Sequence, residues 1–202
     1  GIIKAGATYV PIDPHFPDER VHTIIKSSNS IGLLAQSHLL KSYTMPYLVW
    51  FLEDENLYSK DKSNPPNRCE SNDNLYIIYT SGTTGIPKGV PVKNRSIMNY
   101  ISWFTRAGSI TQNDKTALLS SFAFDLGYTS LYSSILNGAE LHLISRECYS
   151  IPINLYNYLA NNKIDFIKIT PSLFRQLVSD SLLEKSKNFL SLRLLVLGGE
   201  KI

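Results

Sequence analysis

The stretch LYIIYTSGTTGIPKGVPV, Leu75 to Val92, constrains the fold of this chain more than any other part of its sequence. Its first residues, Leu75–Tyr79, are bulky and apolar and predict a buried β-strand. Small residues follow from Thr80 to Gly85, and Lys88 comes soon after. Glycines let successive N–H groups point into one concavity, hydroxyls add donors, and a lysine adds positive charge. These residues predict a phosphate-binding loop, although an ordinary solvent loop has a similar composition.

The family of this loop is indicated by the order of its residues. A Walker A loop is excluded, because Lys88 follows proline and precedes glycine instead of Ser or Thr. The words YTSGTTGIPKGV resemble the phosphate loop of the adenylate-forming superfamily, which includes acyl-CoA ligases, luciferases and the adenylation domains of nonribosomal peptide synthetases. The segment KAGATYVPIDPHFPDER resembles the peptide synthetases most.

The resemblance implies a nucleotide site for ATP and Mg²⁺, in which magnesium bridges the phosphates. The residues it assigns to the β- and γ-phosphates are Thr80, Ser81, Gly82, Thr83, Thr84, Gly85 and Lys88. Of these, Thr80 and Lys88 are expected to act catalytically by stabilising the departing pyrophosphate. Gly198, Gly199 and Glu200 match the turn against which the adenine lies.

Strands that alternate with helices predict a layered α/β fold with parallel-rich sheets and flanking helices. Strands are predicted at 31–35, 115–120, 140–144, 166–169 and 192–197. Helices are predicted to begin at Pro17 and to span 94–106, 153–162 and 171–179. Leu131, Ile135 and Leu136 give a further helix an apolar face, and Gly138 ends it. A short strand is expected before Pro11.

By resemblance, the chain is part of the large N-terminal subdomain of an adenylate-forming enzyme, within one AMP-binding adenylation domain. Residues 1–52 form a first βα portion, 53–72 are a polar surface connector, and 73–202 carry the phosphate loop and the substrate pocket. The family's small C-terminal subdomain, with its catalytic lysine, is not among these residues. We therefore expect the 202 residues alone to be inactive.

Asp125 is unusual because it stands between Phe124 and Leu126, where a carboxylate needs a positive or donating partner. One interpretation is that it caps the helix beyond Gly127. The other follows from the resemblance of FAFDLGYTSLY to the segment in which amino-acid-activating members place an aspartate against the substrate's α-ammonium group.

Lys168 is the second unusual residue, since it lies mid-strand among Phe166, Ile167 and Ile169. It can be a snorkelling lysine on an edge strand. By resemblance, however, this strand end lines the acyl pocket and Lys168 reads the substrate side chain. The full set of pocket residues implied in this way is Asp125, Leu126, Thr129, Lys168, Val196 and Gly198.

This pocket resembles those of synthetase domains that activate L-aspartate, with asparagine second. The expected function is ATP-dependent formation of an aminoacyl-adenylate, a ligase reaction, followed by loading onto a phosphopantetheine carrier in nonribosomal synthesis of a secondary metabolite. Peptidyl carrier and condensation domains are the expected partners in the intact protein. The alternatives are a CoA ligase for an acid without an amine, and a non-catalytic remnant or scaffold.

The composition limits which partners, disulfides and metal sites can be expected. The net charge of +3 comes with no basic run, so no nucleic-acid partner is expected. No apolar run reaches the length of a membrane span, and a cytoplasmic protein without a membrane partner is expected. Cys69 and Cys148 lie far apart and predict neither a disulfide framework nor a metal site.

Overall fold

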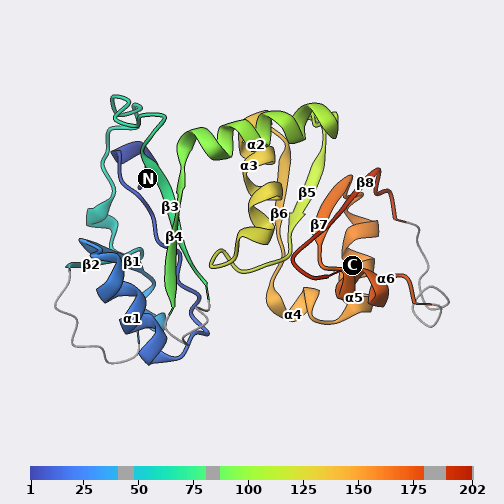
Figure 1. Cartoon of the computed structure of the whole chain (residues 1–202), viewed down its shortest axis with the longest axis horizontal. Coiled ribbons are helices and arrows are strands. Elements are labelled where there is room, and N and C mark those ends of the chain that lie inside the picture. The colour runs from blue at the N-terminus through green and yellow to red at the C-terminus, as the bar shows by residue number, and fades with distance from the viewer. Residues whose placement is uncertain (41–47, 81–86, 180–189, 202) are drawn as a thin grey trace. The chain divides into compact units, whose positions relative to one another are not determined.

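The computed structural model describes residues 1–40, 48–80, 87–179 and 190–201 (Figure 1). The chain forms two compact units, Gly1–Arg95 and Ser96–Ile202, and the division falls in the first turn of helix α2 (Asn94–Ala107). The division predicted from the sequence, at residues 52 and 72, stays a prediction.

The first unit contains two small sheets. Strands β1 (Gly32–Ala35) and β2 (Leu48–Phe51) pair in parallel, and β3 (Asn74–Thr80) and β4 (Lys88–Lys93) pair antiparallel. Helix α1 (Asp18–Ser28) begins after Pro17 with two acids in its first turn, where the helix dipole favours negative charge. Its buried residues, Ile24 and Ile25, are those that anchor it in the core of the unit.

Strand β3 confirms the strand predicted before the loop. Leu75, Tyr76, Ile78 and Tyr79 are buried, and the register pairs Thr80, the last residue of β3, with Lys88, the first residue of β4. The pairing therefore places Thr80 and Lys88 opposite each other on neighbouring strands.

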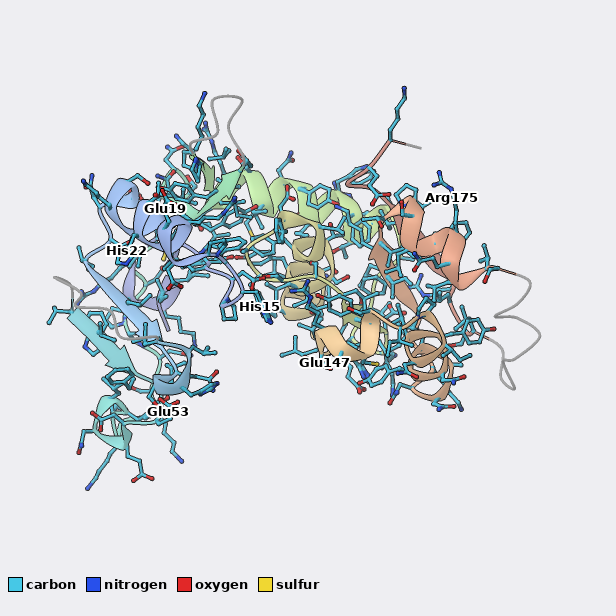
Figure 2. The ribbon with its side chains drawn as sticks, turned by 90° about the horizontal axis from the view of Figure 1, so that it is seen from below. His15, Glu19, His22, Glu53, Glu147 and Arg175 are labelled. Carbon is cyan, nitrogen blue, oxygen red and sulfur yellow. The ribbon has the colours of Figure 1, made fainter. Side chains whose placement is uncertain are left out.

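Elsewhere in this unit regular structure is sparse. The strand expected before Pro11 is a single bridge between Tyr9 and Tyr76. Three short 3-10 helices, Ile3–Ala5, Ser37–Leu39 and Glu55–Leu57, interrupt the irregular segments. Residues 53–72 are exposed apart from the half-buried Cys69. Figure 2 labels Glu53, whose carboxylate accepts the backbone N–H of Ser37 at 3.1 Å.

The second unit is built on a four-stranded parallel sheet. Its strand order is β6 (Glu140–Leu143), β5 (Lys115–Leu118), β7 (Phe166–Ile169) and β8 (Leu194–Leu197). The helices are α3 (Tyr128–Asn137), α4 (Arg146–Tyr149), α5 (Pro152–Asn161) and α6 (Pro171–Leu177), with the 3-10 turn η4 (Asp125–Gly127) before α3. The predicted layered α/β fold with parallel-rich sheets is confirmed.

The two faces of this sheet are covered by different helices (Figure 1). Because side chains alternate along a strand, Ile167 and Ile169 of β7 join the cluster that includes Leu155 and Leu159 of α5. Phe166 points to the other face and packs against Phe104 of α2. Lys168 has the parity of Phe166, so it belongs to the face covered by α2 and α3.

The buried face of α3 corrects the sequence-based expectation. Ile135 and Leu136, predicted to form an apolar face with Leu131, are 63% and 47% exposed. The buried positions instead carry small hydroxyl groups, such as Ser130, Ser133 and Ser134, and two tyrosines. Two of these hydroxyls bond to the backbone of their own helix: Ser133 donates to the carbonyl of Thr129 and Ser134 to that of Leu131. Short side chains let α3 lie close to the sheet.

In the part of the chain that the structure describes, no helix combines the length and the hydropathy that crossing a membrane requires.

Candidate functional site

The centre of the candidate site is the ammonium group of Lys168 on β7. Its Nζ donates a hydrogen bond to Oγ1 of Thr129 at 3.0 Å. Among the described residues, no carboxylate lies within ion-pair distance of this ammonium. The snorkelling interpretation is weakened because β7 is an inner strand, paired with β5 and β8, and not an edge strand.

Thr129 lies in the first turn of α3 and is 1% exposed. Its hydroxyl has a second partner, the hydroxyl of Tyr100 on α2, at 2.9 Å. The sequence assigned no site role to Tyr100, which has helical spacing with Ile97, Ile101 and Phe104 in the helix predicted over 94–106. The signal that could have found it is a hydroxyl on an otherwise apolar helix face.

Val196 on β8 and Gly198, the residue that follows β8, lie beside Lys168. The parallel register pairs Val196 directly with Lys168, and the N–H of Gly198 donates to the carbonyl of Ile169 at 3.1 Å. A Cβ built on Gly198 would lie 3.5 Å from Cε of Lys168, so a larger side chain there would press on the lysine stem. The structure thus brings Thr129, Lys168, Val196 and Gly198 together.

Asp125 is the first residue of η4 and is exposed. Neither η4 nor α3 has a side-chain cap, so the capping interpretation of Asp125 is wrong. Its carboxylate makes no hydrogen bond or ion pair with any other described residue. The next residue, Leu126, lies near Gly199, where an added Cβ would be 3.4 Å from Leu126 Cδ1.

The turn from Gly198 to Glu200 follows β8. Gly199 has φ of +84°, a left-handed conformation that glycine adopts without steric cost. Glu200 accepts hydrogen bonds from Oγ of Ser172 at 2.5 Å and from its N–H at 3.1 Å. The bond from the Ser172 hydroxyl, then that from its N–H, lowers the pKa of the Glu200 carboxyl, and Arg175, labelled on α6 in Figure 2, adds a favourable charge. The turn is thereby tied to the start of α6.

Thr80 and Lys88 belong to the other unit, where they form the last pair of the β3–β4 hairpin and are both exposed. The rest of the predicted phosphate loop, Ser81, Gly82, Thr83, Thr84 and Gly85, lies outside the described residues. The two flanking side chains offer a hydroxyl and an ammonium, which suit phosphate oxygens.

A protein-built metal centre is not found in the described residues, which contain no group of three or more His, Cys, Asp and Glu side chains able to hold a metal ion. Of the two groups beside the loop, the Lys88 ammonium cannot ligate a cation and Thr80 offers a single hydroxyl, so a Mg²⁺ ion here would be held mainly by the phosphate oxygens of a nucleotide. Cys69 and Cys148 are free thiols.

The family to which the chain belongs follows from its match to a family model. The model of the AMP-binding enzyme family matches residues 1–202. The chain belongs to this family. The matched residues include the β3–β4 hairpin of the first unit and Thr129, Lys168, Val196 and Gly198 of the second.

Relatives in the family include large synthetases. The chain is 42% identical over 203 residues to surfactin synthase subunit 2 of Bacillus subtilis (strain 168), covering 100% of this chain and 6% of that protein. It is 41% identical over 201 residues to bacitracin synthase 3 of Bacillus licheniformis, covering 100% of this chain and 3% of that protein. The chain thus spans only a small part of the curated relatives it matches.

The chain is also similar to solved structures of nonribosomal peptide synthetases. The four-domain nonribosomal peptide synthetase holo-AB3403, bound to AMP and glycine, matches 100% of this chain and 14% of its own with a TM-score of 0.81 at 26% identity. The nonribosomal peptide synthetase FmoA3 matches 99% of this chain and 21% of its own with a TM-score of 0.85 at 25% identity.

Proposed function

We propose that the protein carrying this chain is an amino-acid-adenylating ligase, and that its substrate is L-aspartate. The observation that carries the choice of aspartate is the Lys168 ammonium, held by the neutral hydroxyl of Thr129 and without a carboxylate partner among the described residues. A half-buried cation in such surroundings is stabilised by an anion that arrives with the substrate. The β-carboxylate of aspartate is such an anion.

Asp125 supplies the complementary group. Its carboxylate is exposed and unpaired within the described residues, and it lies three residues before the α3 turn that carries Thr129. We assign it to the α-ammonium group of the substrate, which any amino acid presents. In this assignment Asp125 selects amino acids as a class and Lys168 selects among their side chains.

The reaction needs positioning more than covalent chemistry from the protein. An oxygen of the substrate α-carboxylate attacks the α-phosphorus of ATP, the bond to the bridging oxygen of the β-phosphate breaks, and pyrophosphate leaves. Lys88 and Thr80 stabilise the charge on the departing pyrophosphate. Mg²⁺, when bound with ATP, neutralises phosphate charge. A carrier phosphopantetheine thiol then attacks the acyl carbon and releases AMP.

Support for the carrier step comes from the similarity to solved nonribosomal peptide synthetases, one of which has four domains. Carrier and condensation domains are therefore the partners we propose for the intact protein. Asparagine is the second candidate substrate, because its amide oxygen can still accept a hydrogen bond from Lys168.

The test is amino-acid-dependent exchange of labelled pyrophosphate into ATP by the full-length protein, with the proteinogenic amino acids and a set of aryl and fatty acids. We expect aspartate to give the highest kcat/KM, with asparagine next. Exchange that depends only on acids without an amine would favour a CoA ligase instead, and no exchange with any acid would indicate a non-catalytic protein.

A further inference from the structure

Tyr100 on α2 contacts Thr129 and Lys168, although neither the sequence pattern nor the proposed function assigns it a role. Its hydroxyl lies 2.9 Å from Thr129 Oγ1, and Lys168 Nζ lies 6.0 Å from the centroid of its ring. The three side chains come from a helix, a second helix and a strand, and Thr129 Oγ1 is the atom they share.

Thr129 Oγ1 can bond both Tyr100 and Lys168 because a hydroxyl both donates and accepts hydrogen bonds. A threonine hydroxyl has one donor and two acceptor lone pairs, and the Lys168 ammonium can only donate. Thr129 is 1% exposed, so solvent has little access to it. A threonine in a helix also has an alternative rotamer in which its hydroxyl bonds a backbone carbonyl of the preceding turn. Ser133 and Ser134 of the same helix use that kind of bond.

The Tyr100 hydroxyl gives Thr129 a partner outside its own helix. With this partner in place, Oγ1 stays turned toward β7 and its lone pair remains directed at Lys168. Without it, the hydroxyl can turn to its own backbone and release the ammonium. At 6.0 Å the ring adds a weak cation–π attraction, at the outer limit of that interaction.

We propose that Tyr100 is a positioning residue for side-chain selection: through Thr129 it holds the Lys168 ammonium where the substrate side chain arrives. This inference rests on the proposed function, because it takes Lys168 to read that side chain. Packing is the other role open to Tyr100, since its ring also lies 6.3 Å from that of Phe104.

The experiment measures pyrophosphate exchange by the full-length protein and its variants with aspartate and asparagine. Tyr100→Phe removes the hydroxyl and keeps the ring. The matched control is Tyr158→Phe, which removes a hydroxyl that lies 3.0 Å from His142 Nδ1 at the other end of the sheet. The ratio of kcat/KM for aspartate to that for asparagine does not depend on the folded fraction, so a loss of stability leaves it unchanged.

We expect Tyr100→Phe to lower the aspartate-to-asparagine ratio of kcat/KM about fivefold, which corresponds to the net free energy of one hydrogen bond. The change should arise from a higher KM for aspartate, and KM for ATP should stay unchanged. Tyr158→Phe should leave the ratio as it is. Thr129→Val should lower the ratio at least as much as Tyr100→Phe does. In the Thr129→Val background Tyr100→Phe should have no further effect, because it acts through the hydroxyl already lost.

The outcomes separate the two hypotheses. A Tyr100→Phe variant with a lower melting temperature but an unchanged ratio has lost packing only, which overturns the positioning role and leaves the proposed function standing. Full additivity with Thr129→Val overturns it as well. A wild-type protein that prefers a neutral amino acid contradicts the proposed function itself, and the positioning role falls with it.

Discussion

The side chains of Lys168 and Thr129 meet at 3.0 Å although 39 residues separate them in the chain. The contact joins the sheet to the helix that covers it. Because a neutral hydroxyl offsets only a small part of the cost of holding a cation away from water, the ammonium is left with capacity for an anion.

Lys168→Met should remove the preference for aspartate. Leaving one member of a buried pair without its partner costs about 3 to 5 kcal/mol, so the wild-type protein should favour aspartate over leucine by that amount. Against asparagine the margin should be about 1 to 2 kcal/mol. The variant should lose aspartate activation by several orders of magnitude and narrow its gap to leucine, as measured by pyrophosphate exchange.

The matched control for Lys168→Met is Lys115→Met, which changes a lysine of the same sheet that forms an exposed ion pair with Glu140 at 3.3 Å. Its substrate order should match that of the wild-type protein. If Lys168→Met keeps aspartate first by the original margin, Lys168 does not read the substrate.

Asp125→Asn should weaken every amino acid by a similar factor. The substitution removes the negative charge that we assign to the α-ammonium group, which all of these substrates share. We expect kcat/KM to fall about a hundredfold across the panel while the order of substrates is kept. A change of order without a general loss would place Asp125 beside the side chain instead.

Lys88→Ala should slow adenylate formation more than it weakens aspartate binding. Losing one donor to a developing charge costs about 3 kcal/mol, or about a hundredfold in rate. Single-turnover formation of the adenylate measures the rate, and equilibrium dialysis measures the dissociation constant for aspartate. Lys93→Ala, at the other end of the exposed strand β4, is the control and should stay within about twofold of wild type. A raised dissociation constant with an unchanged rate would contradict the phosphate role.

Asp114→Asn should destabilise the sheet in a pH-dependent way. Asp114 is 7% exposed and pairs with Arg193 at 2.8 Å. Burial alone would raise the pKa of its carboxyl, but hydrogen bonds from the N–H of Thr111 and from Arg193 outweigh burial and lower the pKa below its ordinary value of 3.8. The stabilisation is therefore fully present above that value and disappears as the pH falls through the lower folded-state pKa.

Because the Arg193 side chain is 37% exposed, the loss in Asp114→Asn should be about 2 kcal/mol at pH 7, below the range for fully buried pairs. Urea denaturation at pH 7 and at pH 3 measures it, and the difference from wild type should shrink at the lower pH. Lys115→Met, which breaks the exposed pair with Glu140, should cost less than about 1 kcal/mol. A constant difference at both pH values would exclude the Asp114 charge as the cause.

Local patterns were enough to predict much of this structure. The strand at Phe166–Ile169 was predicted with its bounds, because an apolar strand with proline shortly beyond it has few alternatives. The pairing partners of β7 were not predictable, since register between distant strands depends on long-range packing. They decide that Lys168 is on an inner strand and faces α3.

Two features of the site were hidden from sequence patterns for a physical reason. Helix α3 buries hydroxyl groups and exposes Ile135 and Leu136. A hydrophobic pattern predicts the opposite, because it assigns apolar residues to the buried face and polar residues to the exposed one. Tyr100 has the spacing of a core residue within the predicted helix over 94–106, and a pattern of burial carries no information on where a hydroxyl points. In both cases polar groups that satisfy one another occupy positions that usually hold apolar ones.

The alternation of burial along β7 has a consequence for how such a protein can evolve. Phe166, Ile167 and Ile169 are buried in the two apolar clusters, whereas Lys168 alone is half-buried. A mutation at position 168 therefore changes the chemistry offered to an incoming molecule without removing a residue from either cluster. If Lys168 selects the substrate as we propose, descendant lineages can exchange one accepted amino acid for another at this position while the apolar clusters on both faces of the sheet are inherited intact.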